Sequence, residues 1–96
     1  MIIERNKTIE LASPLVEGPR KIDALILGAP TIGAKRQAEA HLRQGTQGEA
    51  ATKFQIAMIA KCAGLLDATV EQLEIDVFNE AWDFVAGFLT YAPETT

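Results

Sequence analysis

The stretch TVEQLEIDVFNEAWDFVAGFLTY, residues 69–91, decides how the rest of the chain can fold. It holds five of the six aromatic residues, and its apolar side chains recur at helical spacing. Asn79, Asp83 and Gly87 form only a narrow polar stripe at i, i+4 and i+8. A helix this apolar needs cover on more than one side. We expect a central helix with one side in a small core and the remainder covered by a second copy or another protein.

The same helix supplies the candidate contact residues. If part of it is exposed, large apolar side chains are the groups that would bind a client or a second copy. These candidates are Phe78, Trp82, Val85, Phe88 and Leu89. The plainer alternative, a helix buried entirely in its own domain, stays open, because periodicity does not decide whether Trp82 faces the core or a partner.

Length and composition bound the class of protein. Ninety-six residues make a single small domain of modest buried surface, so a partner or oligomerisation would add stability. With 48% hydrophobic and 23% charged residues, we expect most of the chain to fold. Cys62 is the single cysteine, no signal region begins the sequence, and charges interrupt every apolar run. These features predict a soluble cytoplasmic protein with no membrane partner.

Charge is divided unevenly along the chain. Residues 1–66 carry nine basic and six acidic residues, a net +3, whereas residues 67–96 carry seven acidic and no basic residues, a net −7. This asymmetry could steer a partner or bring the acidic end of one copy to the basic end of another. Solvated faces are the plainer interpretation.

Two short strands are predicted near the N-terminus. Residues 7–11, KTIEL, alternate polar and apolar side chains, and residues 20–27, RKIDALIL, do the same. The second strand has three apolar residues on one face: Ile22, Ala24 and Ile26. The segment between the strands, SPLVEGPR, contains two prolines and a glycine and predicts a fairly long loop. We expect an antiparallel β-hairpin over about residues 7–27, with its apolar face against helices because two strands alone are barely stable.

A bundle of three to four α-helices is predicted after the hairpin, giving an α+β domain over residues 1–96. Thr31 is the expected N-cap of the first, mostly exposed helix, and Gly64 is the expected C-cap of the second, core helix. Thr69, with Gln72 three residues later, resembles a capping box, and Asp76 is the expected cap of the last helix. The predicted ranges are 31–44, 49–63, 69–75 and 76–90, followed by a frayed tail over 92–96.

Sites for catalysis, cofactors or metals are not supported by the sequence. The run GAPTIGAK from Gly28 echoes a phosphate-binding loop, but Lys35 comes one residue late and no Ser or Thr follows it. His41 and Cys62 are each the single residue of their type, and a metal site needs more ligands. Acidic pairs such as Glu80 and Asp83 fit a solvated helix edge better than acid–base work in a cleft. We predict no enzyme activity, no cofactor and no metal.

A nucleic-acid partner is also disfavoured. Lys35, Arg36 and Arg43 lie along one predicted helix and could touch phosphates. However, the sequence pI is near 4.9, and the aromatic residues lie at the acidic end, apart from these basic side chains. We therefore expect no nucleic acid among the partners.

The order of features along residues 8–90 is more specific than any single motif. In sequence it runs Leu11-x-x-Pro14, Ile22-x-x-Leu25-x-Leu27, Pro30-Thr31-x-Gly33, Ala63-Gly64-Leu65, Val70-x-x-Leu73-x-x-Asp76 and Val85-x-x-Phe88-Leu89. This order resembles the tail assembly chaperones of contractile-tailed phages and prophages, the family of tail assembly protein E and its Mu-like counterparts. The chain departs from the family at Ala34-Lys35, where an acidic residue often follows Pro-Thr-x-Gly.

The resemblance implies a small, non-catalytic protein of the host cytoplasm that is absent from the finished virion. Its implied partner is the long, helical tape-measure protein, which it holds soluble while tail-tube subunits polymerise. The tail-tube protein and further copies of the chain are additional candidate partners. Two alternatives stay open: a structural tail or head subunit that self-assembles through the same surface and, less favoured, a small DNA-binding regulator.

Overall fold

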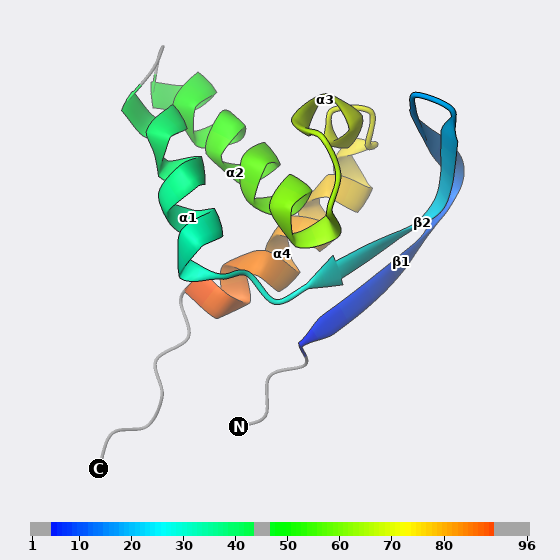
Figure 1. Cartoon of the computed structure of the whole chain (residues 1–96), viewed down its shortest axis with the longest axis horizontal. Helices are drawn as coiled ribbons and strands as arrows, with labels where there is room; N and C mark the ends of the chain where they lie inside the picture. The colour runs from blue at the N-terminus through cyan, green and yellow to red at the C-terminus, as the bar shows by residue number, and fades with distance from the viewer. Residues whose placement is uncertain (1–4, 44–46, 90–96) are drawn as a thin grey trace.

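The computed structural model describes residues 5–43 and 47–89, in which an antiparallel hairpin is followed by helices (Figure 1). The predicted α+β class is therefore confirmed. The elements in chain order are β1 Asn6–Glu17, β2 Arg20–Gly28, α1 Ile32–Glu39, the 3-10 helix η1 Ala40–Arg43, α2 Gln47–Ala63, α3 Asp67–Val70 and α4 Ile75–Leu89.

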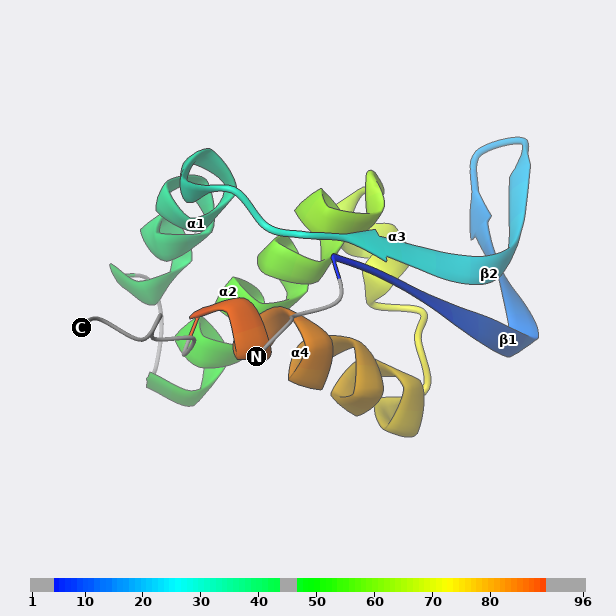
Figure 2. The ribbon, with the colours of Figure 1, turned by 90° about the horizontal axis from the view of Figure 1, so that it is seen from below.

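Helix α2 is the centre of the fold. It contacts α1 and η1, β2, α3 and α4, and Figure 2 shows it enclosed between these elements. Four successive residues, from Ala57 to Ala60, are almost fully buried, which requires neighbours on several sides of the helix. The prediction of a core helix here is correct. Helix α1 is mostly exposed, as expected, and contributes only Ala38 to the buried core.

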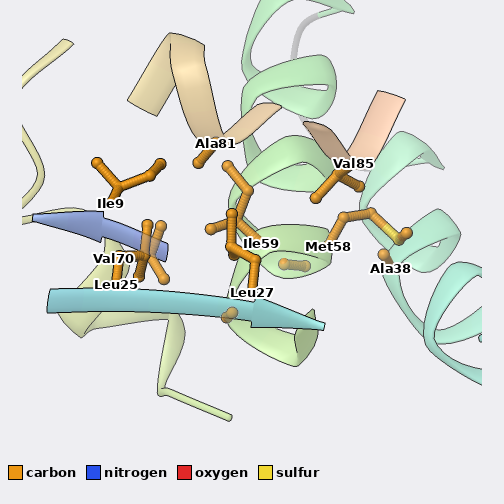
Figure 3. Packing of buried hydrophobic residues seen from close by; sticks show 11 residues of the cluster. Ile9, Leu25, Leu27, Ala38, Met58, Ile59, Val70, Ala81 and Val85 are labelled. Atoms are coloured by element: carbon orange, nitrogen blue, oxygen red, sulfur yellow. The ribbon is translucent and has the colours of Figure 1, made fainter. Parts of the chain in front are cut away.

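One apolar cluster joins the hairpin to the helices (Figure 3). Leu25 and Leu27 of β2 are fully buried against Met58 and Ile59 of α2. Full burial of one such side chain stabilises the fold by about 1.5–3 kcal/mol. The other fully or nearly fully buried members are Ile9, Ala38, Ala57, Ala60, Val70, Ala81 and Val85.

The buried face of β2 differs from the predicted one. Ile26, expected on the apolar face with Ile22 and Ala24, is 63% exposed, whereas Leu25 and Leu27 have no exposed surface. Residues 24–27 are apolar on both faces of the strand, so alternation alone does not identify the inner face. The helices packed against the sheet make that choice.

The predicted long loop of the hairpin is wrong. Strand β1 continues to Glu17, and the turn consists of Gly18 and Pro19 alone. Gly18 has φ +60°, which suits the first position of a two-residue type II′ turn and which a side chain would disfavour. Pro14, which appeared to end the strand, falls where residues 11–14 of β1 face the single Asp23 of β2, so its missing N–H breaks no regular pair.

Helix α3 begins two residues earlier than predicted and ends at Val70. Thr69 is not its N-cap but lies within it, and its hydroxyl donates to Glu17 Oε2 at 2.7 Å. A backbone turn from residue 71 to 74 then separates α3 from α4, through Gln72 N–H to Thr69 O at 3.1 Å and Leu73 N–H to Val70 O at 3.0 Å. The expected capping box is lost because the threonine side chain is used by the hairpin.

The other predicted caps have mixed outcomes. Thr31 Oγ1 accepts from Ala34 N–H at 3.1 Å, so the predicted N-cap is confirmed. Gly64 has φ +68°, and Leu65 N–H donates to Ala60 O at 2.9 Å, the 6→1 bond of a glycine C-cap. Asp76 does not cap α4, because the helix already begins at Ile75. The predicted last residue of this helix, 90, and the tail over 92–96 lie outside the described residues.

Candidate functional site

Helix α4 has a buried stripe between two half-buried flanks. Ala81 and Val85 are fully buried and face the core. One flank carries Phe78 and Trp82, whose ring meets the Phe54 ring of α2 edge-on at 6.0 Å between centroids. The opposite flank carries Phe84, whose ring packs against Phe88. The aromatic surplus that marked this segment is therefore divided between two directions.

The five predicted contact residues do not form one surface. Val85 is 0% exposed, so it is unavailable to a partner and supports the helix from beneath. Phe78, Trp82 and Leu89 are half-buried and pack at the edge of the core. Phe88 lies elsewhere, with its ring edge-on to Phe84 at 5.2 Å and the Arg5 guanidinium 6.0 Å from its centroid.

An open apolar groove of about 430 Å³ runs along the flank that carries Phe78. Its walls come from three places: α2, α3 with the turn after it, and the first turn of α4. Ile75 is 78% exposed at its rim, and Val70 is 1% exposed at its floor. The lining residues are Thr52, Ile56, Val70, Glu71, Leu73, Ile75, Phe78 and Asn79. We name this surface the α2–α4 groove.

Sequence patterns identified only one of these lining residues, Phe78, as a contact. Ile56 lies in the predicted core helix over 49–63, and Leu73 and Ile75 lie in the predicted short helix over 69–75. The available signal was the surplus of apolar residues between Leu65 and Ile75, since a four-residue α3 cannot cover them all. The groove itself depends on tertiary packing that brings α2 beside a turn some 15 to 20 residues later.

A polar clasp holds α3 and the turn after it against the far end of the hairpin. The Gln72 side chain makes two hydrogen bonds with Val16, donating from Nε2 to the carbonyl at 2.7 Å and accepting the amide at Oε1 at 2.9 Å. Glu17 Oε2 accepts from Leu66 N–H at 2.9 Å and from the Thr69 hydroxyl. Because Gln72 lies between Glu71 and Leu73, this clasp fixes one wall of the α2–α4 groove.

These hydrogen bonds favour the ionised form of Glu17. The Leu66 amide contributes most, followed by the Thr69 hydroxyl, and Arg20, at 3.3 Å from Oε1, adds a favourable charge. Together they lower the pKa of Glu17 below its ordinary value, against a smaller opposing effect of burial. The clasp is therefore charged at neutral pH.

The residues weighed for chemistry do not gather into a reactive site. Residues 5–43 and 47–89 contain no group of three or more His, Cys, Asp or Glu side chains placed to hold a metal ion. His41 Nε2 lies 3.9 Å from Asp67, and burial raises the pKa of the half-buried Cys62 thiol to about 11. That thiol is protonated at neutral pH and is a poor nucleophile. None of the helices in the described ranges has the length and apolar character needed to cross a membrane.

Comparison with known families decides the relationship of the chain. The family model described as phage tail assembly chaperone proteins, E, or 41 or 14, matches residues 8–90. The chain belongs to this family. No curated protein and no solved structure matches it. The match covers every element described above except the first residues of β1. The hairpin, the clasp and the groove of this tail assembly chaperone therefore lie almost entirely within the matched residues.

Family membership gives the general role. The protein is a phage tail assembly chaperone, and its partners are proteins of tail assembly. Its fold provides an open apolar groove and, among the described residues, no cluster placed to hold a metal ion.

Proposed function

We propose that this tail assembly chaperone keeps the tape-measure protein soluble by binding helical segments of it in the α2–α4 groove. The observation that carries the proposal is the groove itself, an apolar surface with Ile75 78% exposed on a member of this family. A small domain gains stability by covering such a surface, so an apolar surface that stays open favours a binding role. A client that is long and helical offers matching apolar faces.

The groove suits a helix better than an extended strand. Its walls come from α2, α3 with the turn after it, and α4, whereas strand addition uses the edge of a sheet. A helix would place apolar residues at i, i+3 or i+4 and i+7 over Ile56, Leu73 and Phe78. Trp82, next to Phe78 on the same flank, would extend the contact towards the end of α4.

The proposal places the protein in the host cytoplasm during assembly and outside the finished virion. A structural subunit that self-assembles through the same groove would instead remain in mature particles. Mass spectrometry of purified particles separates these roles: the chaperone is expected to be absent, whereas stoichiometric recovery with the tail would favour the structural subunit.

Co-expression with the cognate tape-measure protein tests the client directly. The tape-measure protein is expected to be insoluble alone and soluble with the chaperone, and the two should elute together on a sizing column. Ile75→Ser, at the rim of the groove, should abolish this rescue while the variant itself stays folded. Ile26→Ser is the matched control, since Ile26 is 63% exposed on β2 outside the groove and should behave as wild type. Rescue by both variants would contradict the groove as the client site.

A further inference from the structure

The rim of the α2–α4 groove is acidic while its floor is apolar. Glu71 lines the groove and Asp76 follows the exposed Ile75 at its rim, whereas Glu74, in the turn between them, lines the hollow against residues 11–15 of β1. All three side chains are exposed. Residues 67–89 contain six acidic residues and no basic one, so α3, the turn after it and α4 border the apolar floor with charge of one sign.

The carboxylates at the rim are not neutralised within the described residues. Glu80 is paired with Lys7 at 3.4 Å, and Asp67 lies near His41, but no Lys or Arg of the described ranges lies within 4.0 Å of Glu71, Glu74 or Asp76. Lys53 lines the hollow on the other side of Glu71 without forming such a pair. Two of the three acids also suit the N-terminal end of α4, where the helix dipole favours negative charge. Glu71 has no such role.

An apolar floor with an unpaired acidic rim specifies the chemistry of its occupant. Apolar side chains of a helix would enter the groove, and the residues beside that stripe, towards α3 and the start of α4, would face Glu71 and Asp76. Basic residues there gain attraction, whereas acidic residues meet like charge and lose affinity. We propose that the α2–α4 groove selects amphipathic helices whose apolar stripe is flanked by Lys or Arg. The inference rests on the proposed function in taking a helix as the occupant.

Two synthetic helices provide the probe. Each has about 20 residues, roughly 30 Å as a helix, and the same leucine stripe, flanked by lysines in one and by glutamates in the other. Binding of the fluorescently labelled peptides to the full chain is measured by anisotropy. At about 0.1 M salt the lysine peptide should bind at least about tenfold more tightly, and at about 1 M salt, where screening acts over roughly 3 Å, the difference should largely vanish.

Charge variants locate the selectivity. The double variant Glu71→Gln, Asp76→Asn should bind both peptides equally at either salt concentration. The control Glu10→Gln, Asp23→Asn removes the same number of exposed acids from the hairpin, away from the groove, and should keep the full preference. Equal binding of the two peptides by the wild-type chain, or a preference that survives the double variant, would overturn the inference.

Two further outcomes are distinguishable. If the chaperone rescues the tape-measure protein but shows no peptide preference, charge selection fails while the proposed function stands. If the lysine peptide is preferred but the tape-measure protein is not rescued, the selection stands and the assignment of that client fails. Sedimentation of the protein alone covers the remaining occupant: a dimer that Ile75→Ser dissociates would show a second copy in the groove and overturn the inference.

Discussion

The packing between α2 and α4 has an inner surface in the core and an outer surface at the α2–α4 groove. Similar apolar side chains form both surfaces, but only the inner one is buried. On the inner surface, Met58 and Ile59 of α2 meet Val85 of α4, and none of the three has exposed surface. On the outer surface, Ile56 and Phe78 are half-buried around the α2–α4 groove. The difference is closure: β2 packs against α2 on the inner surface (Figure 1), whereas the α2–α4 groove stays open among the described residues. Apolar composition therefore does not separate core from interface; the neighbouring elements do.

The largest effect should come from breaking the inner surface. Met58→Ala leaves a cavity where the structure cannot collapse, and a buried large-to-small change of this kind costs about 2–5 kcal/mol. Ile56→Ala, on the same helix but at the groove, should cost clearly less because that side chain is only half-buried. Urea unfolding followed by circular dichroism measures both free energies of unfolding. Equal losses for the two variants would contradict the contrast between the surfaces.

Trp82 tests the boundary between the two surfaces. It packs against Phe54 and the core but keeps part of its surface exposed, so Trp82→Ala should cost roughly half of the ~3–5 kcal/mol typical of a fully buried aromatic residue. The same variant should weaken rescue of the tape-measure protein even below its unfolding temperature. Circular dichroism reports the stability and co-expression the binding. Full destabilisation with normal rescue would assign Trp82 to the core alone.

The sequence predicted those parts of the fold that depend on local signals. The N-cap at Thr31 and the glycine cap at Gly64 follow from side chains acting on their own helices, and both are present. The extent of α3 was missed because Thr69 bonds to Glu17, 52 residues earlier. A hydrogen bond of that separation leaves no periodic or capping pattern. The prediction that the strand ends before Pro14 was wrong for a related reason. Only the register shift opposite Asp23 lets the strand accommodate the proline.

The surplus of apolar surface was predictable from the sequence, but the place of the groove was not. Surplus apolar surface on α4 identified Phe78 and Trp82, which lie on the half-exposed flank. Val85 shares their helical spacing, but the packing of α2 against α4 turns it inward. Leu73 and Ile75 were missed because their exposure follows from the shortness of α3 and the position of the turn after it.

The clasp between hairpin and turn should have a smaller effect, concentrated at the groove. Gln72→Ala removes two hydrogen bonds to the Val16 backbone, for an expected loss of about 1 kcal/mol each at most, because these groups are exposed and water can replace the bonds. Gln72→Glu is a sharper variant, since it can still accept the Val16 amide but cannot donate to the Val16 carbonyl.

Amide hydrogen exchange shows whether the clasp acts locally. Both Gln72 variants should speed exchange at Val16 and in the turn at Gln72 and Leu73, while the amides of α2 near Met58 keep their protection. Uniform acceleration throughout the chain would mean that the clasp supports the whole fold. Unchanged exchange at Val16 would mean that the clasp stabilises neither the end of the hairpin nor the whole fold.

The smallest expected effect is a pH dependence carried by Glu17. Its folded-state pKa lies below the ordinary value of 4.5, so the ionised carboxylate favours the folded state. That contribution is present above about pH 4.5 and is lost as the pH falls through the lowered pKa. Glu17→Gln should therefore reduce stability at pH 7 and converge with wild type under acid conditions, as measured by urea unfolding across pH 3–7. Glu10→Gln, exposed on the same strand, should follow the wild-type curve at every pH. A Glu17→Gln curve parallel to wild type throughout would mean that the carboxylate gains nothing from Leu66 and Thr69, and that the Gln72–Val16 hydrogen bonds and packing hold the far end of the hairpin.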